Sequence, residues 1–296
     1  MRWLTILIGV FLVSPIVAFS QVDKNLGSFP ESAAKGYIQP LVDVMGANLN
    51  SGLYHTASMS KFLGFYVGVK GMAVFVPSSM KKFTAELGSD YNPSRVETAT
   101  VFGDKDGGAK TKYGNFPDSV KLPGGIGLKL VPLAVPQVSL STMNSELLVR
   151  FVTSIKINDD VGSVDLLGIG LGHSISQYIP MFPINVAIQG VYQQLKIGNY
   201  LKATALNVNV HASKSFVFFT LYGGVGYETF SADINYSYKP PIPIADIIKT
   251  ISFSLKGKNN FRATAGFKLG FAIFDLNVDY SIGSVNVLSA GFGFSF

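Results

Sequence analysis

The sequence contains no cysteine, which excludes a disulfide framework and any thiolate metal site. It also excludes a lipoprotein signal, which needs a cysteine at its cleavage point. Among the histidines His55, His173 and His211, no two have the spacing of metal ligands. His173 and Ser174 are adjacent, so on a strand they point to opposite faces and cannot form a catalytic pair. We therefore expect no metal, no cofactor, no catalytic residue and no enzyme activity.

Charge is also scarce. Only 14% of the residues are charged, whereas 48% are hydrophobic, and the formal net charge is +6. The basic residues are scattered apart from Lys81–Lys82, and no recognition motif accompanies them, so we expect no nucleic-acid partner. Beyond the N-terminal segment, no apolar run approaches the length of a membrane-spanning helix. A hydrophobic chain without such helices is typical of a transmembrane β-barrel, in which apolar residues recur at every second position.

The N-terminus has the layout of a cleaved secretory signal peptide. A single early arginine precedes an apolar run over 4–13, and Ala18 and Ser20 occupy the −3 and −1 positions. The alternative is a buried or membrane-spanning helix, but the apolar run is shorter than the roughly 20 residues that spanning requires. We predict a signal peptide over residues 1–20, a mature chain that starts at Gln21, and location in the bacterial outer membrane.

The first part of the mature chain differs from the rest. Residues 21–61 do not alternate, and they predict a short helix that starts after Pro30 and is limited by Pro40. We expect this segment to form a plug or a periplasmic latch. Residues 77–123 are polar and rich in turn residues, which predicts a large loop region. Beyond it, Pro132 and Pro136 are expected to interrupt any regular ladder.

From residue 62 onward, apolar residues alternate with small or polar ones. The final stretch SAGFGFSF, residues 289–296, places Ala290 and three phenylalanines on one face, and further runs of about ten residues repeat the pattern. Turns such as 257–260 separate several of them. One such run has its apolar stripe at Ile251, Phe253 and Leu255.

A soluble β-sandwich also alternates, but it buries the apolar face and wets the other. Here the polar face is rich in Gly, Ser, Thr and Asn, and Tyr192, Tyr227 and Tyr280 stand at strand ends, as interfacial aromatic girdles do. We predict an all-β fold, an antiparallel transmembrane β-barrel over 62–296 with about 12 strands, within a range of roughly 10 to 14. Its apolar face contacts outer-membrane lipid, and its last strand pairs with its first.

The polar faces supply the candidate lumen-lining residues, which are Arg150, Lys156, His211, Glu228, Arg262, Lys268, Asp275 and Asp279. They form either the wall of a pore for anionic solutes or a set of satisfied interior ion pairs. A turn centred on 271–272 places Lys268 across from Asp275 and Thr264 across from Asp279. Opposite charges at facing positions then offset each other's desolvation.

The last hairpin pairs Leu276 with Phe292 if both apolar faces are to stay together. The strand count contains one conflict. If Phe296 ends in the periplasm, the proline-rich stretch 239–246 lies on the same side, where connections are normally short. One strand near 229–250 is therefore misassigned.

The closing stretch SAGFGFSF also resembles the last strand of bacterial outer-membrane barrels, which end in phenylalanine. The resemblance implies that Phe292, Phe294 and Phe296 are a signal for the barrel-assembly machinery. The phrases GANLNSGLYHTA, LPGGIGLKLVPLAVPQVSL, GLGHSISQYIPMFPINVAIQGVYQQLKIG and TLYGGVGYE resemble an uncharacterised outer-membrane family of Bacteroidetes-like bacteria. That family is distantly similar to long-chain fatty-acid and hydrocarbon transporters. The resemblance covers most of the mature chain and implies fold and location, but no catalytic or ligand residue.

Two functions follow from these observations. The first is passive transport of small solutes, hydrophobic ones included, which predicts an open or gated lumen. The second is a non-transporting structural or adhesive barrel that acts through 77–123, which predicts a plugged lumen. A barrel of about 10 strands favours the second function and one of about 14 the first.

Overall fold

The computed structural model describes residues 25–114, 119–158, 162–179, 181–238 and 249–296, so the expected signal peptide, residues 1–20, lies outside it. Its strands form one large antiparallel sheet and two small ones. The large sheet contains β1 (Gly64–Phe75), β7 (Leu130–Thr142), β8 (Ser145–Asn158), β9 (Gly162–Ser174), β10 (Asn185–Ile197), β11 (Leu201–Ser215), β12 (Phe219–Tyr238), β13 (Lys249–Lys256), β14 (Phe261–Phe271), β15 (Phe274–Ile282) and β16 (Val287–Ser295). The small sheets contain β2 (Lys82–Glu86) with β4 (Arg95–Ala99), and β3 (Tyr91–Asn92) with β5 (Lys110–Tyr113) and β6 (Ser119–Lys121). The main helix is α2 (Glu31–Leu49), and η1 (Ser78–Met80) and η2 (Ser176–Tyr178) are short 3-10 turns.

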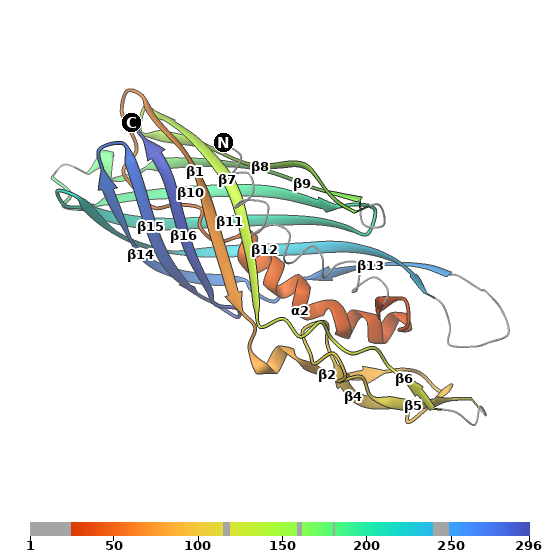
Figure 1. Cartoon of the computed structure of the whole chain (residues 1–296). Coiled ribbons are helices and arrows are strands. Elements are labelled where there is room, and N and C mark those ends of the chain that lie inside the picture. The colour runs from red at the N-terminus through yellow and green to blue at the C-terminus, as the bar shows by residue number, and fades with distance from the viewer. Residues whose placement is uncertain (1–24, 115–118, 159–161, 180, 239–248) are drawn as a thin grey trace.

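Ten strands of the described chain close into a barrel. Their order is β11, β10, β9, β8, β7, β1, β16, β15, β14 and β12, and β12 pairs back with β11 (Figure 1). The last strand, β16, pairs with the first strand, β1, because a barrel without edges requires this closure. The predicted antiparallel barrel is confirmed, and its ten strands lie at the lower bound of the predicted range instead of at about 12.

The number of strands differs from the prediction because β13 and β14 both pair with β12, one after the other along its length. Residues 219–227 of β12 pair with 261–269, and residues 231–238 of β12 pair with 249–256. The stretch 257–260 therefore interrupts one long strand, whereas the sequence analysis treats it as a turn. Because the chain does not reverse there, β12 ends and β13 begins at the end of the barrel remote from Phe296. The conflict over 239–246 disappears, although those residues lie outside the described part.

The two ends of the barrel have different connections. The Phe296 end carries the chain terminus and the links 143–144, 175–184, 216–218 and 272–273. The far end carries the turn 283–286 and a long excursion between β1 and β7, residues 76–129, which we call the appendage. The appendage contains both small sheets, and its two stems are held together by the hydrogen bond from Val76 N to Lys129 O, at 3.0 Å.

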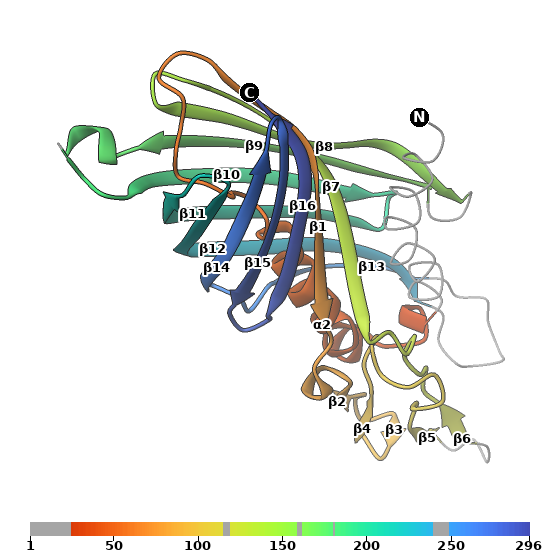
Figure 2. The same cartoon turned by 60° about the vertical axis from the view of Figure 1, so that its left-hand side comes forward.

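Strand β7 runs through Pro132 and Pro136, so the expected interruption of the ladder does not occur. Over 130–136, β7 pairs with β1 alone, because its pairing with β8 is confined to 137–142. Proline lacks a backbone donor, so it fits a strand that has no partner on its other edge. Strands β7 and β8 therefore separate toward the far end, and the ring is closed only in the half near Phe296 (Figure 2).

The register of the last hairpin agrees with the prediction, and the register of the preceding hairpin differs from it. Leu276 pairs with Phe292, as predicted. In the preceding hairpin, Lys268 pairs with Asn277 instead of Asp275, because the turn lies at 272–273, where Ala272 has a positive φ of 53°. A diagonal ion pair of 3.4 Å between Lys268 and Asp275 forms nevertheless.

Helix α2 begins directly after Pro30, as predicted, but it continues through Pro40 to Leu49. The expectation that Pro40 limits the helix is wrong, because burial along most of its length offsets the hydrogen bond that proline removes. No helix of the described residues is both long and apolar enough to cross a membrane. After Asn50 the chain runs through the inside of the ring and reaches β1 at the Phe296 end (Figure 2).

Candidate functional site

The outer face of the barrel is apolar in the half near Phe296. On β11, Leu206, Val208 and Val210 point outward and are exposed. The other strands continue this band with exposed Leu140, Leu147, Phe151, Leu167, Ile169, Leu171, Ile188, Tyr192, Leu221, Val225, Tyr227, Phe267, Leu269, Leu276, Val278, Tyr280 and Phe292. A continuous exposed band of this size indicates contact with another apolar medium.

Toward the far end the same strands invert this polarity. On β11 the outward residues become Lys202 and Thr204, while Leu201 and Ala203 point inward and are buried. On β12, beyond Tyr227, Ser231 and Asp233 are exposed and their inward neighbours are apolar. The inward apolar side chains of this half are Val152, Val164, Leu166, Leu195, Ile197, Leu201, Ala203, Ala205, Phe230, Ala232, Ile234, Tyr236, Ile251 and Phe253.

The reason for the inversion is α2, which lies against the inner face of this half (Figure 1). Gly46 marks the closest approach, because a Cβ at Gly46 would lie 2.7 Å from the Cβ of Phe230. The stripe Ile251, Phe253 and Leu255, which the sequence analysis assigns to the lipid-facing side, packs in the cluster around α2 instead. In this half the barrel wall therefore behaves as one layer of a water-soluble domain.

Helix α2 also holds the appendage. Gly36 lies against β2, since a Cβ there would meet the ring of Phe83 at 2.4 Å. The Tyr37 hydroxyl donates to Gly124 O at 3.1 Å, and Tyr37 O accepts from Val101 N at 3.0 Å. Burial raises the pKa of Tyr37 to about 12. The barrel wall, α2 and the appendage thus form one packed body at the far end.

The C-terminal end of α2 is fixed by two side chains from the barrel wall. Arg150 on β8 is fully buried, and it donates to Leu49 O at 3.1 Å, to Ser51 O at 2.9 Å and to Gly52 O at 2.6 Å. Gln193 on β10 donates to Leu49 O at 2.7 Å. Leu49 O is one of the carbonyls that the end of a helix leaves unpaired, Ser51 O and Gly52 O follow it in the chain, and a cation beside them also complements the helix dipole.

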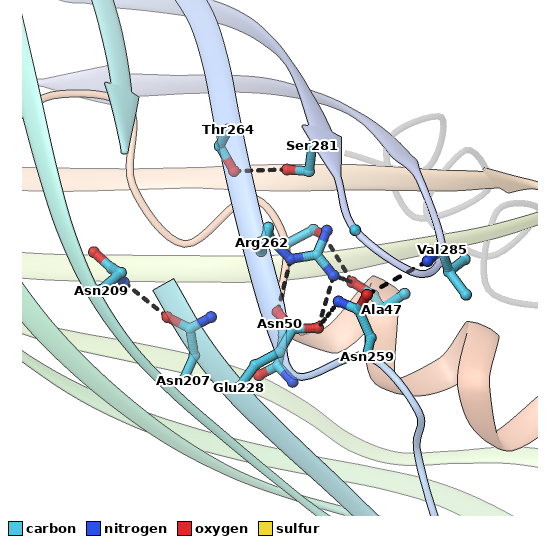
Figure 3. A network of polar contacts seen from close by, with 12 residues as sticks. Ala47, Asn50, Asn207, Asn209, Glu228, Asn259, Arg262, Thr264, Ser281 and Val285 are labelled. Carbon is cyan, nitrogen blue, oxygen red and sulfur yellow. Dashed lines mark hydrogen bonds and ion pairs between the residues drawn. The ribbon is translucent and has the colours of Figure 1, made fainter. Parts of the chain in front are cut away.

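A buried ion pair holds the opposite wall (Figure 3). Arg262 on β14 donates to both carboxylate oxygens of Glu228 on β12, at 2.7 and 2.9 Å, and to Ala47 O of α2 at 3.2 Å. Asn259, in the interruption between β13 and β14, donates to Glu228 and accepts from Val285 N at 3.4 Å. The pair therefore ties α2 to β12 and β14 and, through Asn259, to the turn 283–286.

The chain after α2 fills the ring in the half near Phe296. The Tyr54 ring stacks on His211, with 4.1 Å between centroids and an interplanar angle of 10°. His55 Nδ1 lies 3.2 Å from the ammonium group of Lys70, which also donates to Asn277 Oδ1 at 2.6 Å. The inside of this half is therefore a polar core in which the chain after α2 is bonded to the barrel wall.

A space of about 10 Å³ lies beside the ion pair, between Tyr54, Asn209, Arg262 and Asp279, and it holds at most about one water molecule. A larger cavity of about 470 Å³ lies at the junction of α2, the appendage and the turn 283–286.

The structure places seven of the eight candidate lumen residues on the inner face. Arg150, His211, Glu228, Arg262, Asp275 and Asp279 are buried there, and Lys268 points the same way with 18% of its side chain exposed. Lys156 lies on the outer face instead. The reason is a β-bulge after Val152, where Ser154 has a positive φ of 43° and the alternation shifts by one residue.

Several inward residues were missed by the sequence analysis. The fully buried residues Lys70, Gln137 and Gln193 were not selected, although each lies opposite an outward apolar stripe. Period-two alternation alone identifies Lys70, because it stands between Val69 and Gly71 at an inward position of β1.

One further polar contact has the elements of a catalytic pair. Ser145 Oγ lies 2.8 Å from His173 Nδ1, because the two residues pair directly across β8 and β9. At the other nitrogen of the imidazole, Gln177 Nε2 lies 2.9 Å from His173 Nε2 and donates to Ser174 O. An amide nitrogen only donates, so the ring proton is assigned to Nδ1. In this tautomer His173 cannot accept the serine proton, and the contact is not arranged for nucleophilic catalysis.

The three phenylalanines of the predicted assembly signal lie on the outer face of β16 and at the chain end. Phe292 and Phe294 flank Phe274, and Phe296 bonds through its backbone N to Phe65 O at 3.1 Å. Their role as a signal stays a prediction.

A family model described as a family of unknown function, DUF6588, matches residues 1–296, and the chain belongs to this family. No curated protein matches the chain. Among solved structures, the N-terminal β-barrel domain of Pseudomonas aeruginosa OprF shares 14% identity with a TM-score of 0.24, and the match covers 52% of this chain and 98% of that one. The attachment invasion locus protein Ail of Yersinia pestis shares 11% identity with a TM-score of 0.26, over 80% of this chain and 100% of that one. The translocator domain of the autotransporter NalP of Neisseria meningitidis shares 10% identity with a TM-score of 0.27, over 89% and 99% of the two chains. These scores are too low to carry a function from one protein to another.

Proposed function

We propose that this protein is a sealed outer-membrane barrel that holds α2 and the appendage outside the bilayer and acts through them without transporting solutes. The observation that carries the proposal is the polarity inversion along single strands. Apolar outward residues on β11 give way to Lys202 and Thr204 without any change of strand. A soluble barrel has no reason for the first arrangement, and a barrel immersed along its whole length has no reason for the second.

The connections support an orientation. Bacterial outer-membrane barrels have short periplasmic turns and longer extracellular loops. The longest link at the Phe296 end is 175–184, whereas the far end carries the appendage, residues 76–129, beside short turns such as 198–200 and 283–286. The Phe296 end is therefore periplasmic in this proposal, and α2 with the appendage faces the outside of the cell. Helix α2 then acts as a plug and not as a periplasmic latch.

The filled interior favours a non-transporting role over passive transport. A ring of ten strands is only slightly wider than one of about eight strands, whose interior its own side chains fill. Here residues 50–57 add a further segment of the same chain inside it, fixed by Arg150 and Lys70. Transport of hydrophobic solutes and the distant similarity to fatty-acid transporters stay predictions without support from this geometry. The proposed function includes no catalysis and no cofactor.

Vesicle swelling tests the sealed interior. Vesicles that contain the protein are expected to shrink and stay shrunken in solutions of small sugars and amino acids, as empty vesicles do. Solute-dependent swelling at the rate of an open porin would contradict the proposal.

A second test removes the appendage, because its stems are already joined by the bond from Val76 to Lys129 and a short Gly-Ser linker closes the gap. Surface attachment of cells that express the protein is expected to fall while the barrel still assembles. Unchanged attachment would exclude the appendage as the acting part.

A further inference from the structure

The links at the Phe296 end expose large apolar side chains. Met181 and Val217 are each 99% exposed, Met143 and Phe218 are also exposed in these links, and Phe62 and Phe271 are exposed beside them. The described chain covers none of these six side chains. Exposed apolar groups are ordinary when they are scattered, but here they gather at one rim of one molecule.

At the same rim, exposed charge lies beside the links and not in them, since Lys61 O accepts from Met143 N and the Lys214 ammonium donates to Pro183 O. The links 143–144, 175–184, 216–218 and 272–273 contain no Asp, Glu, Lys or Arg. The appendage, at the opposite end, carries charges throughout, with exposed ion pairs such as Lys82–Glu97 and Arg95–Glu86. Turns that face water normally carry polar residues, so these four links are built for a different surrounding.

The dimensions of the outer band lead to the same conclusion. From Leu206 to Val210 the outward apolar row on β11 covers four residues, which is about 14 Å of strand and about 10 Å along the membrane normal at a tilt of about 45°. The apolar band of a transmembrane barrel is about 25 Å tall. Continuing from Leu206 to Val217 adds seven residues and gives about 26 Å at the same tilt. On β11 the band reaches the thickness of the hydrocarbon layer only if it continues past Lys214 into the link 216–218. On β14 the outward apolar row from Phe261 to the rim residue Phe271 covers about 24 Å at the same tilt.

We infer that the rim at the Phe296 end, around Met143, Met181, Val217 and Phe271, is immersed in the apolar part of the bilayer. This inference rests on the proposed membrane function. Its support is the continuity of the rim with the outer band, since Leu147 and Leu171 on β8 and β9 stand directly beside it. The barrel then ends at the inner boundary of the membrane, and all its protruding mass lies on the other side.

Fluorescence quenching by lipid tests the inference. The sequence has one tryptophan, Trp3, so each new tryptophan in a Trp3→Phe background is the single probe. Rim probes are the Met181→Trp and Val217→Trp variants, the band probe is Val208→Trp, and the far-half probe is Ser231→Trp. Each variant is placed in vesicles of phosphatidylcholine, with and without phosphatidylcholine brominated on its acyl chains. Two rim positions are used so that one of them still gives a result if the other variant fails to assemble.

Both rim probes are expected to be quenched to the extent of the Val208→Trp variant and to emit at a similarly blue-shifted wavelength, whereas the Ser231→Trp variant stays unquenched. Quenching of the band probe without quenching of the rim probes overturns the inference and leaves the membrane function standing. In that case, blue-shifted rim emission points to a protein partner at the rim and red-shifted emission points to water. If the Val208→Trp variant is itself unquenched, the membrane function fails as well.

Discussion

The two halves of this barrel have opposite polarity on the outer and inner faces of the same strands. Near Phe296 the outer face is apolar, and the inner face carries Lys70, His211 and Asp279 in a polar core. Toward the far end the outer face is polar, and the inner face packs on α2 through residues such as Phe230. A strand has two faces whatever surrounds it, so the solvent on each side decides which face is apolar. In the proposed membrane location, the change of face along β11 and β12 marks the position where the surrounding medium changes.

The largest expected effect is at the inner face of the far half. The Phe230→Ala variant removes a ring that is packed against Gly46, and we expect a loss of about 3–5 kcal/mol in the free energy of unfolding. The control is Phe267→Ala, because Phe267 is outward and exposed on β14. Urea unfolding in vesicles compares the two variants. Equal losses would mean that the far half is not packed as a domain.

The ion pair between the halves gives the next effect. In the Glu228→Gln variant the guanidinium of Arg262 stays buried without a counter-charge, and we expect a loss of about 3 kcal/mol in unfolding free energy. Replacing both partners, in the Glu228→Gln and Arg262→Met double variant, is expected to recover part of that loss. A double variant as unstable as the sum of the two single variants would show that the pair does not act as a unit.

A charge introduced on the outer face tests directly whether the two halves have different surroundings. The Val208→Arg variant places a charge in the apolar band, and we expect it to cost about 2 kcal/mol of folding free energy in vesicles. The Thr204→Arg variant, four residues away on the same face of the same strand, is expected to cost about 0–1 kcal/mol. Folding titrations into vesicles measure both. A cost at Thr204 equal to that at Val208 would remove the boundary between the halves.

The smallest effect concerns the end of α2. The Gln193→Leu variant removes one donor to Leu49 O, which keeps its bond from Arg150, so we expect a loss of about 1 kcal/mol in the local opening free energy. Its neighbour Gln194 is exposed on the outer face, and the Gln194→Leu variant is expected to leave it unchanged. Hydrogen exchange of the amides near Leu49 provides the measurement. Faster exchange in both variants would assign the effect to the strand and not to the helix end.

The sequence predicts the half near Phe296 better than the other half, for a physical reason. Alternation defines the outward stripe and the register of Leu276 with Phe292, because lipid and a polar core place opposite demands on the two faces. The inversion is not visible in the pattern, because Ile251 and Phe253 alternate with serine in the same way whether they face lipid or α2.

Features that depend on contacts between distant segments also cannot be predicted from the alternation of apolar and polar residues. The stretch 257–260 has the composition of a turn, yet Asn259 bonds to Glu228 and to the turn 283–286 and holds the chain in one direction. The bulge after Val152 moves Lys156 to the outer face. Pro40 and Pro136 are accommodated by helix burial and by a missing strand partner, and neither is a local property of the sequence.

Cysteine labelling along β12 tests the central claim most directly, because the chain has no cysteine of its own. Single cysteines replace the outward residues Leu221, Val225, Tyr227, Ser231, Asp233 and Asn235 in turn, and a water-soluble maleimide is applied to the reconstituted protein. We predict no labelling from Leu221 to Tyr227 and full labelling at Ser231 and Asp233. Labelling at all six positions, or at none, would contradict a membrane boundary that crosses the strand between Tyr227 and Ser231.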